Sequence, residues 1–366
     1  MSFKKIKFVL IFLLLYQTPL QSKSITSNNF DSNNLSKYFS GIVAFENKDN
    51  STALDFFNSS KILTTNHDPY LKKYMYSLVL ENKISQAINL IKKNKGESNT
   101  NFFEGYILLV IDSLKKNDLK RAKAYLNEID SLGQQDRLNS AILESFEQYL
   151  YVFKEKKITQ NKKNFGRLSI ISETFERCYL NDTAVDKYFS RLINDPESDY
   201  TRYTYFYLSY LIENNRIDDA LRITMDINYL NSTLLLSQGK NWVENKNIDK
   251  FTNLFSCKNS NDLIGEFLFL IANLYSSQEN YEKSNFYLNL SVFFNPKFSF
   301  NLSLSASNYF VKKDYQQVKK ILKNFKKNDN FYYWYRVKQE AQIISKQRNK
   351  IESLNYILAE FNKIKD

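Results

Sequence analysis

The sequence has 366 residues, of which only seven are glycine and four proline, while 29 are Phe and 26 Tyr. So few turn-forming residues argue against a protein with many β-turns and favour helices joined by short polar turns. Fifty-one Lys and Arg against 39 Asp and Glu give a net charge of +12. A basic total can indicate a nucleic-acid or anionic membrane partner, but the basic residues form no concentrated footprint. We interpret the excess as lysine on solvated helix faces.

The amino end has the order of a secretory signal. Three lysines between residues 4 and 7 precede an apolar run at residues 8–16, and Ser22 and Ser24 follow. This order predicts a signal peptide over residues 1–24 and a periplasmic protein. The alternative is an uncleaved signal that anchors the protein in the inner membrane, although so short an apolar run is little for a span. Residues 25–34 are predicted to be a polar lead-in.

Residues 35–131 carry a small side chain on a regular period. Ala53, Ala87 and Ala122 follow one another at nearly equal intervals, each within an amphipathic helical pattern. A small residue at such a position lets two helices of one hairpin approach closely. We therefore predict three two-helix repeats in this range.

The pattern weakens over residues 132–200. Residues 138–153 still predict an amphipathic helix, but a lysine-rich segment follows it. We expect a degenerate repeat with a shortened second helix; the alternative is a joint between two sub-arrays. Residues 168–179 and 184–193 predict the next hairpin.

Residues 201–366 predict further hairpins, the last of which, 331–345 with 351–361, is expected to act as a polar cap. The clearest two lie between positions 265 and 330, where the same side chains recur with a period of about 34 residues. The recurring pairs are Leu268 and Leu302, Ala272 and Ala306, Tyr275 and Tyr309, Tyr281 and Tyr315, and Leu288 and Leu322. One such hairpin cannot bury its apolar face alone, so successive hairpins are expected to stack.

This recurring pattern resembles the tetratricopeptide repeat superfamily over roughly residues 35–361. Its order behind a signal peptide resembles exported tetratricopeptide proteins of alphaproteobacteria. The resemblance implies an all-α fold, a right-handed α-solenoid of antiparallel helix pairs. It also implies a concave groove, built from the first helix of each pair, that binds protein or peptide partners and performs no chemistry.

In that frame, one set of first-helix positions is expected to line the groove, and for each the alternative is packing against the next repeat. The positions are Phe45, Tyr76, Ile111, Tyr205, Phe269, Asn273 and Phe310. The partners expected are envelope proteins or peptides. A Lys/Asn/Arg set that would grip a terminal carboxylate is absent from adjacent clean repeats.

Residues that carry chemistry are few. The single histidine, His67, lies in a polar turn, and the pair Glu144 and Glu147 is interpreted as solvated charge. Cys178 and Cys257 belong to different repeats, and a disulfide needs Cα atoms within about 7 Å, so we expect buried thiols rather than a disulfide. No glycine-rich phosphate loop occurs. We therefore predict no catalytic, cofactor-binding or metal-binding residues.

Two alternatives to a soluble scaffold remain open. One is a membrane-tethered envelope assembly factor that keeps residues 8–16. The other is a peptidoglycan-acting enzyme related to the superhelical lytic transglycosylases, which carry a separate catalytic domain after the helices. We expect no such domain here, because the predicted repeats continue to the last residues.

Overall fold

The computed structural model describes residues 32–47, 49–64, 67–97, 100–132, 136–160, 162–194, 201–327 and 330–365. Within these ranges the protein is all α-helical, as predicted, with 19 α-helices and no β-strand. The predicted signal peptide and most of the polar lead-in lie outside the described residues. In the part that the structure describes, no helix combines the length and apolar character needed to cross a membrane.

The first half of the chain begins with three successive helical hairpins. These are α2 (Ser32–Glu46) with α3 (Asn50–Ser59), α4 (Asp68–Leu80) with α5 (Ile84–Asn94), and α6 (Phe103–Lys115) with α7 (Leu119–Asp130). A short 3₁₀ helix, η1 (Lys61–Thr64), joins the first hairpin to the second. The helices that follow are α8 (Arg137–Glu155), α9 (Arg167–Leu180) and α10 (Val185–Ile193).

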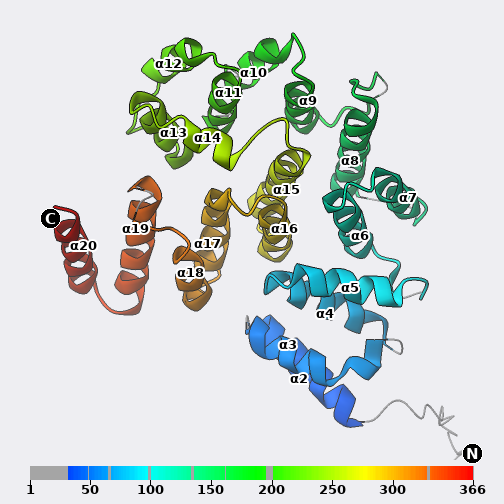
Figure 1. Ribbon diagram of the computed structural model, residues 1–366. Helices are drawn as coiled ribbons and strands as arrows, with labels where there is room; N and C mark the ends of the chain where they lie inside the picture. The colour runs from blue at the N-terminus through cyan, green and yellow to red at the C-terminus, as the bar shows by residue number, and fades with distance from the viewer. Residues whose placement is uncertain are drawn as a thin grey trace, which may run out of the picture.

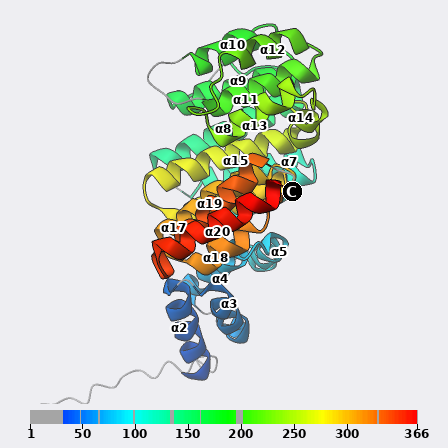
Figure 2. The same ribbon diagram turned by 90° about the vertical axis from the view of Figure 1, so that its left-hand side faces the viewer.

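The second half includes another 3₁₀ helix, η3 (Ser299–Asn301). Its helices are α11 (Thr201–Glu213), α12 (Ile217–Met225), α13 (Leu234–Glu244), α14 (Asp249–Leu254), α15 (Ser260–Ser277), α16 (Tyr281–Phe294), α17 (Leu302–Val311), α18 (Tyr315–Leu322), α19 (Asn330–Gln347) and α20 (Lys350–Lys365). Figure 2 shows α2 and α3 at one extremity of the molecule and α10 and α12 at the other.

Seven of the hairpins use one and the same turn. After α6, Asn117 has a positive φ of 57°, and the next residue, Asp118, donates its backbone N–H to the carbonyl of Ser113 at 2.8 Å. This is a Schellman turn, which satisfies carbonyls at the end of a helix. Asn tolerates the left-handed conformation better than most residues, so the turn needs no glycine. The residues at this position are Asn82, Asn117, Asn181, Asn215, Lys246, Glu279 and Lys313.

Helix α8 is not followed by a second helix, which corrects the expectation of a shortened one. It runs for 19 residues to Glu155, and the next helix begins only at Arg167. Residues 156–160 and 162–166 are not helical. Lysine and asparagine dominate this segment, so it has no apolar stripe with which a helix would pack on α8.

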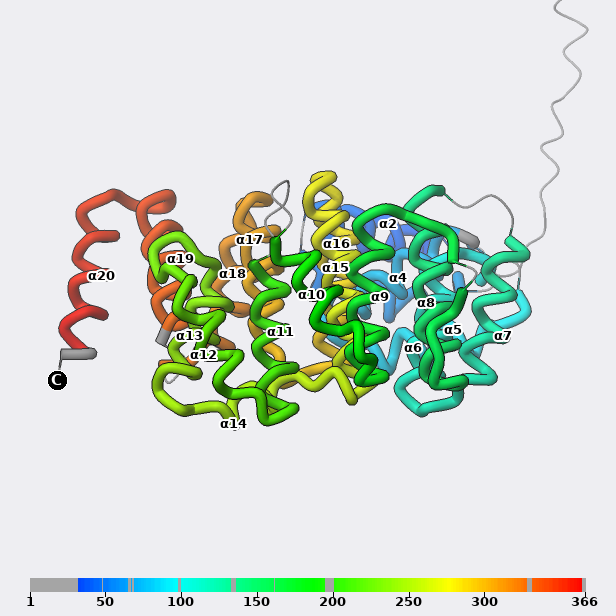
Figure 3. Tube along the Cα trace, turned by 90° about the horizontal axis from the view of Figure 1, so that it is seen from above, coloured from blue at the N-terminus to red at the C-terminus, as the bar shows by residue number. Residues whose placement is uncertain are grey.

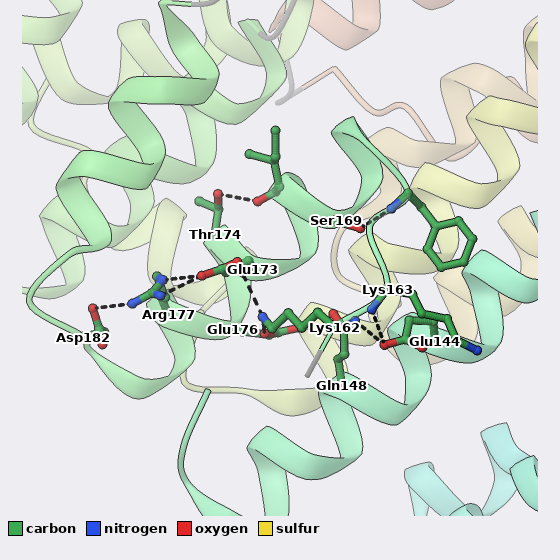
Figure 4. Close-up of polar contacts among 12 residues, drawn as sticks. Glu144, Gln148, Lys162, Lys163, Ser169, Glu173, Thr174, Glu176, Arg177 and Asp182 are labelled. Carbon is green, nitrogen blue, oxygen red and sulfur yellow. Dashed lines mark hydrogen bonds and ion pairs between the residues drawn. The ribbon is translucent and has the colours of Figure 1, made fainter. Parts of the chain in front are cut away.

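This segment forms no helix, and polar contacts fix its position instead (Figure 4). The ammonium group of Lys162 lies 2.8 Å from a carboxylate oxygen of Glu176, whose side chain is fully buried. Burial raises the pKa of the Glu176 carboxyl, although Lys162 opposes that shift. The backbone N–H of Lys163 donates to Glu144 on α8 at 3.3 Å. The segment thus links α8 to α9 through ion pairs and hydrogen bonds.

Helices α15 and α16 lie in the middle of the molecule, with hairpins from both halves of the chain around them (Figure 1). Helix α16 packs against α4 and α5, which stand far earlier in the sequence. The rings of Tyr76 and Phe286 are 4.8 Å apart, and the side-chain amide of Asn289 donates to the carbonyl of Val79 at 2.9 Å. On α6, Lys115 donates to the carbonyl of Phe294 at 3.1 Å.

Helix α15 makes the corresponding contacts with the middle of the chain. The ring of Phe267 lies 5.2 Å from Phe146 on α8. On α11, Nε and Nη2 of Arg202 donate hydrogen bonds to the two carboxylate oxygens of Glu266, at 2.7 and 2.6 Å. The hairpins around α15 and α16 therefore contact these two helices as well as their neighbours in sequence. Figure 3 shows the same arrangement from above, with α20 and α7 at opposite ends.

Cys178 and Cys257 form a disulfide, which corrects the expectation of buried thiols. Cys178 lies on α9 and Cys257 just before α15, and their Cα atoms are 5.6 Å apart. The expectation assumed that only successive hairpins meet. Because α15 packs directly against α9, two cysteines 79 residues apart come together.

The last helix is not the polar cap that the sequence predicts. The side chains of Ile351, Leu354 and Phe361 on α20 are exposed by 72%, 55% and 46%. The prediction rested on the charged residues that follow Phe361. The prediction did not anticipate that the apolar residues of α20 are exposed to solvent.

Candidate functional site

Four of the seven predicted groove residues are buried in the core, Phe45 with 8% exposed and three others. Tyr76, Ile111 and Tyr205 are all buried, with 3%, 0% and 0% of their side chains exposed. Tyr76 packs on Phe286, and the ring of Tyr205 lies 5.2 Å from that of Phe251. This corrects their assignment to a groove: Tyr76 meets α16 instead of solvent.

The other three have different surroundings. Phe269 is half-buried beneath the guanidinium of Arg202, 3.7 Å from the centre of its ring, and Asn273 is exposed on the same helix. Phe310 is half-buried beside Tyr315, with ring centres 5.6 Å apart. Phe45, in contrast, lines a sizeable cleft in the described part of the chain. The structure therefore does not assemble the seven residues into one groove.

Phe45 belongs to a cleft of about 510 Å³, which we call the amino-terminal cleft. Its walls come from α2 and α3 on one side and from α16, α17 and the turn between α15 and α16 on the other. The lining includes Phe45, Asn50, Gln278, Tyr281, Glu282 and Lys312. Segments from opposite halves of the chain thus form one site.

Asn50 gives the cleft a buried hydrogen-bond acceptor. Its side-chain nitrogen donates to the carbonyl of Ser77 at 2.9 Å and to Glu81 at 3.3 Å. Its side-chain oxygen is buried and accepts no hydrogen bond from the described residues. A buried acceptor without a donor is costly, and this one belongs to a residue of the cleft lining.

Four charged residues line the cleft, Glu46, Glu279, Glu282 and Lys312, and all four are exposed. Glu46 lies 3.3 Å from the ammonium of Lys73, and that ammonium also lies 4.5 Å from the ring centre of Phe45. The ammonium of Lys312 sits 5.4 Å from the ring centre of Tyr281. The cleft therefore has a polar lining, with three carboxylates and one ammonium group, and apolar rings at its edges.

A second cleft of about 540 Å³ continues along the same seam between the two ends of the chain. It is lined by Asn47 and Asp49 after α2, and by Gln316, Gln317 and Gln347 from the opposite side. The side chains of Asn and Gln carry both donors and an acceptor, as a peptide backbone does. Amide groups therefore line both clefts.

The residues considered for chemistry have structural contacts. His67 packs edge-on against Tyr38, with ring centres 4.7 Å apart. Glu147 lies 2.6 Å from the ammonium of Lys123, and Glu144 accepts from Gln148 at 2.8 Å. Among the described residues, no group of three or more His, Cys, Asp or Glu is placed to hold a metal ion.

Sequence reasoning missed Asn50, Gln278 and Glu282 as site residues. Their positions lie at or next to hairpin turns, where polar residues are ordinary. A signal was present only in the other wall: a helical stretch that is apolar on most sides, such as residues 286–294, must be covered by distant parts of the chain.

Comparisons with known protein families and curated proteins gave no match.

Proposed function

We propose that this protein is a non-catalytic helical-repeat scaffold of the bacterial periplasm that binds an extended segment of a partner protein in the amino-terminal cleft. The observation that carries the proposal is the cleft itself. It combines the buried, unpartnered acceptor of Asn50 with apolar rings and amide side chains. Such a lining suits a peptide backbone and a few apolar side chains.

The architecture we propose is a right-handed solenoid of antiparallel helix pairs of the tetratricopeptide type. Two observations support it: the Schellman turn recurs in seven hairpins, and the small residues Ala53, Ala87 and Ala122 are fully buried. In this proposal the array coils around its own α15 and α16. The concave face is then filled by the chain, and partner binding moves to the seam between its two ends.

The periplasmic location rests on two features. The amino end has the order of a signal peptide, and Cys178 is bonded to Cys257. Disulfides persist in oxidising compartments such as the periplasm and are rare in the cytosol. Mass spectrometry of the mature amino terminus distinguishes a membrane-tethered form, which keeps the signal, from a cleaved form. Cleavage near residue 24 is the expected result.

Photocrosslinking in cells tests the binding site. A benzophenone amino acid at Gln278, an exposed residue on the rim of the cleft, is expected to capture one or a few envelope proteins on irradiation. The control carries the same group at Met225 on α12, whose side chain is 76% exposed and lies outside the cleft. It is expected to capture none of the same proteins.

A variant then ties the capture to the cleft. Tyr281→Ala removes a ring from the lining and is expected to lower capture at Gln278 by roughly tenfold, the effect of a loss of about 1.4 kcal/mol in binding. Equal capture from both positions, or capture that Tyr281→Ala leaves unchanged, would contradict the proposed site.

A further inference from the structure

The helix α20 turns its polar side inward. Ser353 donates to the carbonyl of Ala341 on α19 at 2.8 Å. Tyr333 of α19 donates to Glu360, and Tyr356 of α20 donates to a carboxylate of α19. The contact between these two helices therefore uses hydrogen bonds where the hairpins of the core use apolar side chains.

The apolar side of α20 is left open to solvent. Ile351, Leu354, Leu358 and Phe361 are exposed by 72%, 55%, 49% and 46%, and Ile357 beside them by 36%. One end of this stripe meets α19, where the rings of Trp334 and Phe361 are 6.3 Å apart. At about half of a large side chain's area each, the five offer roughly 500 Å², as large as the largest apolar patch on a typical monomer.

The spacing of the stripe indicates what covers it. Residues 351, 354, 358 and 361 follow intervals of three, four and three, which place Ile351 and Leu358 at position a of a heptad and Leu354 and Phe361 at position d. A narrow seam of a and d residues packs against one other helix, whereas a broader apolar face packs into a groove.

The residues beside the seam favour a second copy of the same helix. The e positions hold Asn355 and Asn362, and the g positions hold Lys350, Ile357 and Ile364. Charged residues at e and g normally select a partner or repel a like copy. Of these five residues only Lys350 is charged, and in an antiparallel pair the two copies of Lys350 lie at opposite ends of the seam, so two identical seams meet without repulsion.

We propose that α20 is a homodimer interface, in which the α20 helices of two copies pair antiparallel about a two-fold axis. Ile351 of one copy then lies opposite Phe361 of the other, and Leu354 lies opposite Leu358. Two stripes of this size bury roughly 1,000 Å², the lower limit of a specific interface. The proposal does not depend on the function of the amino-terminal cleft.

The amino-terminal helix α2 offers a weaker surface. Phe39 and Val43 are both exposed by 59%, but they are the only large apolar residues that the helix exposes in the described part. An α20 seam seated on α2 of another copy would be a head-to-tail contact, which builds open chains instead of closed dimers. The two arrangements are therefore distinguishable by mass.

Sedimentation equilibrium of the full chain tests the proposal. The wild type is expected to be a dimer at micromolar concentration, and the double variant Leu354→Glu with Leu358→Glu a monomer with at least a hundredfold weaker association. Both positions are solvent-exposed in the monomer, so the circular dichroism spectrum of the variant is expected to stay unchanged. The control variant Phe39→Glu with Val43→Glu is expected to remain dimeric.

Cysteine trapping tests the direction of pairing. A mixture of Leu354→Cys and Leu358→Cys chains is expected to form a covalent dimer on mild oxidation, and each variant alone much less. The native cysteines do not interfere, because they are bonded to each other and buried. A monomeric wild type, a mass that grows without limit, or equal trapping of each variant alone would overturn the proposal.

Discussion

The hairpins α15–α16 and α17–α18 share a sequence pattern but not an environment. Ala272 and Ala306 occupy the same position of the repeat and both are fully buried, so the first helices use the same close approach. In α16, however, most side chains are buried on every side, whereas in α18 only Val318 and Leu322 are. One hairpin is an interior element of the molecule and the other forms part of its surface.

The difference lies on the outer face of the second helix. Phe286, Asn289 and Phe293 of α16 correspond, one repeat later, to lysines of the basic face of α18 and the segment after it. A helix that is apolar around its whole circumference is buried, whereas an amphipathic one lies at the surface. The repeat pattern sets the shape of the hairpin, and the residues outside the pattern set its position.

The largest loss of stability is expected when a buried residue of α16 is replaced by the residue that α18 has at the corresponding position. Phe286→Lys gives α16 the residue that stands at the same repeat position of α18, and it places an unpaired charge in a fully buried site. We expect a loss of more than about 4 kcal/mol in the free energy of unfolding, measured by urea denaturation. The control Lys320→Ala, at the exposed counterpart, is expected to change it by less than about 1 kcal/mol. Similar losses at both positions would show that the environments do not differ.

Removing the disulfide is the next largest change. It ties the chain just before α15 to α9, and no such link fixes α17–α18. We expect Cys178→Ala with Cys257→Ala to lower the free energy of unfolding by about 2–4 kcal/mol, since the bond closes a long loop in the unfolded chain. Reductant is expected to shift the urea midpoint of the wild type and leave that of the variant unchanged. An identical midpoint of the wild type with and without reductant would refute the link.

Glu104 joins three helices around the interior hairpin. Its carboxylate lies 3.4 Å from the ammonium of Lys72 on α4 and 3.2 Å from that of Lys283 on α16. Burial alone would raise the pKa of Glu104, but the two lysines outweigh it and the pKa lies below its usual 4.5. A lowered pKa stabilises the fold above the usual pKa of the carboxyl, and this contribution is lost as the pH falls through the lowered one.

Glu104→Gln is therefore expected to cost about 1–3 kcal/mol at pH 7 and less at pH 3. Chemical denaturation at both pH values measures the difference. The control Glu147→Gln breaks a more exposed pair with Lys123 and is expected to cost at most about 1 kcal/mol. A loss at Glu104 that is independent of pH would mean that its charge does not hold α16 in place.

The smallest effect concerns the turn that the two hairpins share. Glu279 and Lys313 both have positive φ values, 60° and 62°. Glycine adopts this conformation without the strain of a side chain, so Glu279→Gly and Lys313→Gly are each expected to raise the free energy of unfolding by about 0.5 kcal/mol. Thermal denaturation compares the two. If one substitution raised the free energy of unfolding and the other lowered it, the two turns would not be equivalent.

The helical class could be predicted because it depends on local patterns. The alternation of apolar residues and the recurring small residues Ala53, Ala87 and Ala122 report packing between neighbours. The insertion of α15–α16 could not be predicted from the same patterns, since it depends on contacts between remote parts of the chain, such as Tyr76 with Phe286. The error on Cys178 and Cys257 had the same origin.

The site was predicted less well than the fold. Tyr76, Ile111 and Tyr205 were placed in a groove because a first helix of an open array faces one. The inserted hairpin covers such positions and turns them into core. Phe45 lines the amino-terminal cleft, yet the opposite wall comes from α16 and α17, and nothing in the local sequence around Phe45 indicates that wall.

Zero-length crosslinking followed by mass spectrometry tests most directly whether α15 and α16 occupy the interior. A carbodiimide joins a carboxylate to an amine only where they touch. It is expected to link Glu104 to Lys283 and Glu81 to Lys320, whose charged groups lie 3.2 and 3.3 Å apart. The local pair Lys123 and Glu147 serves as the positive control. Recovery of the control link alone, with no link between the two halves of the chain, would contradict the account.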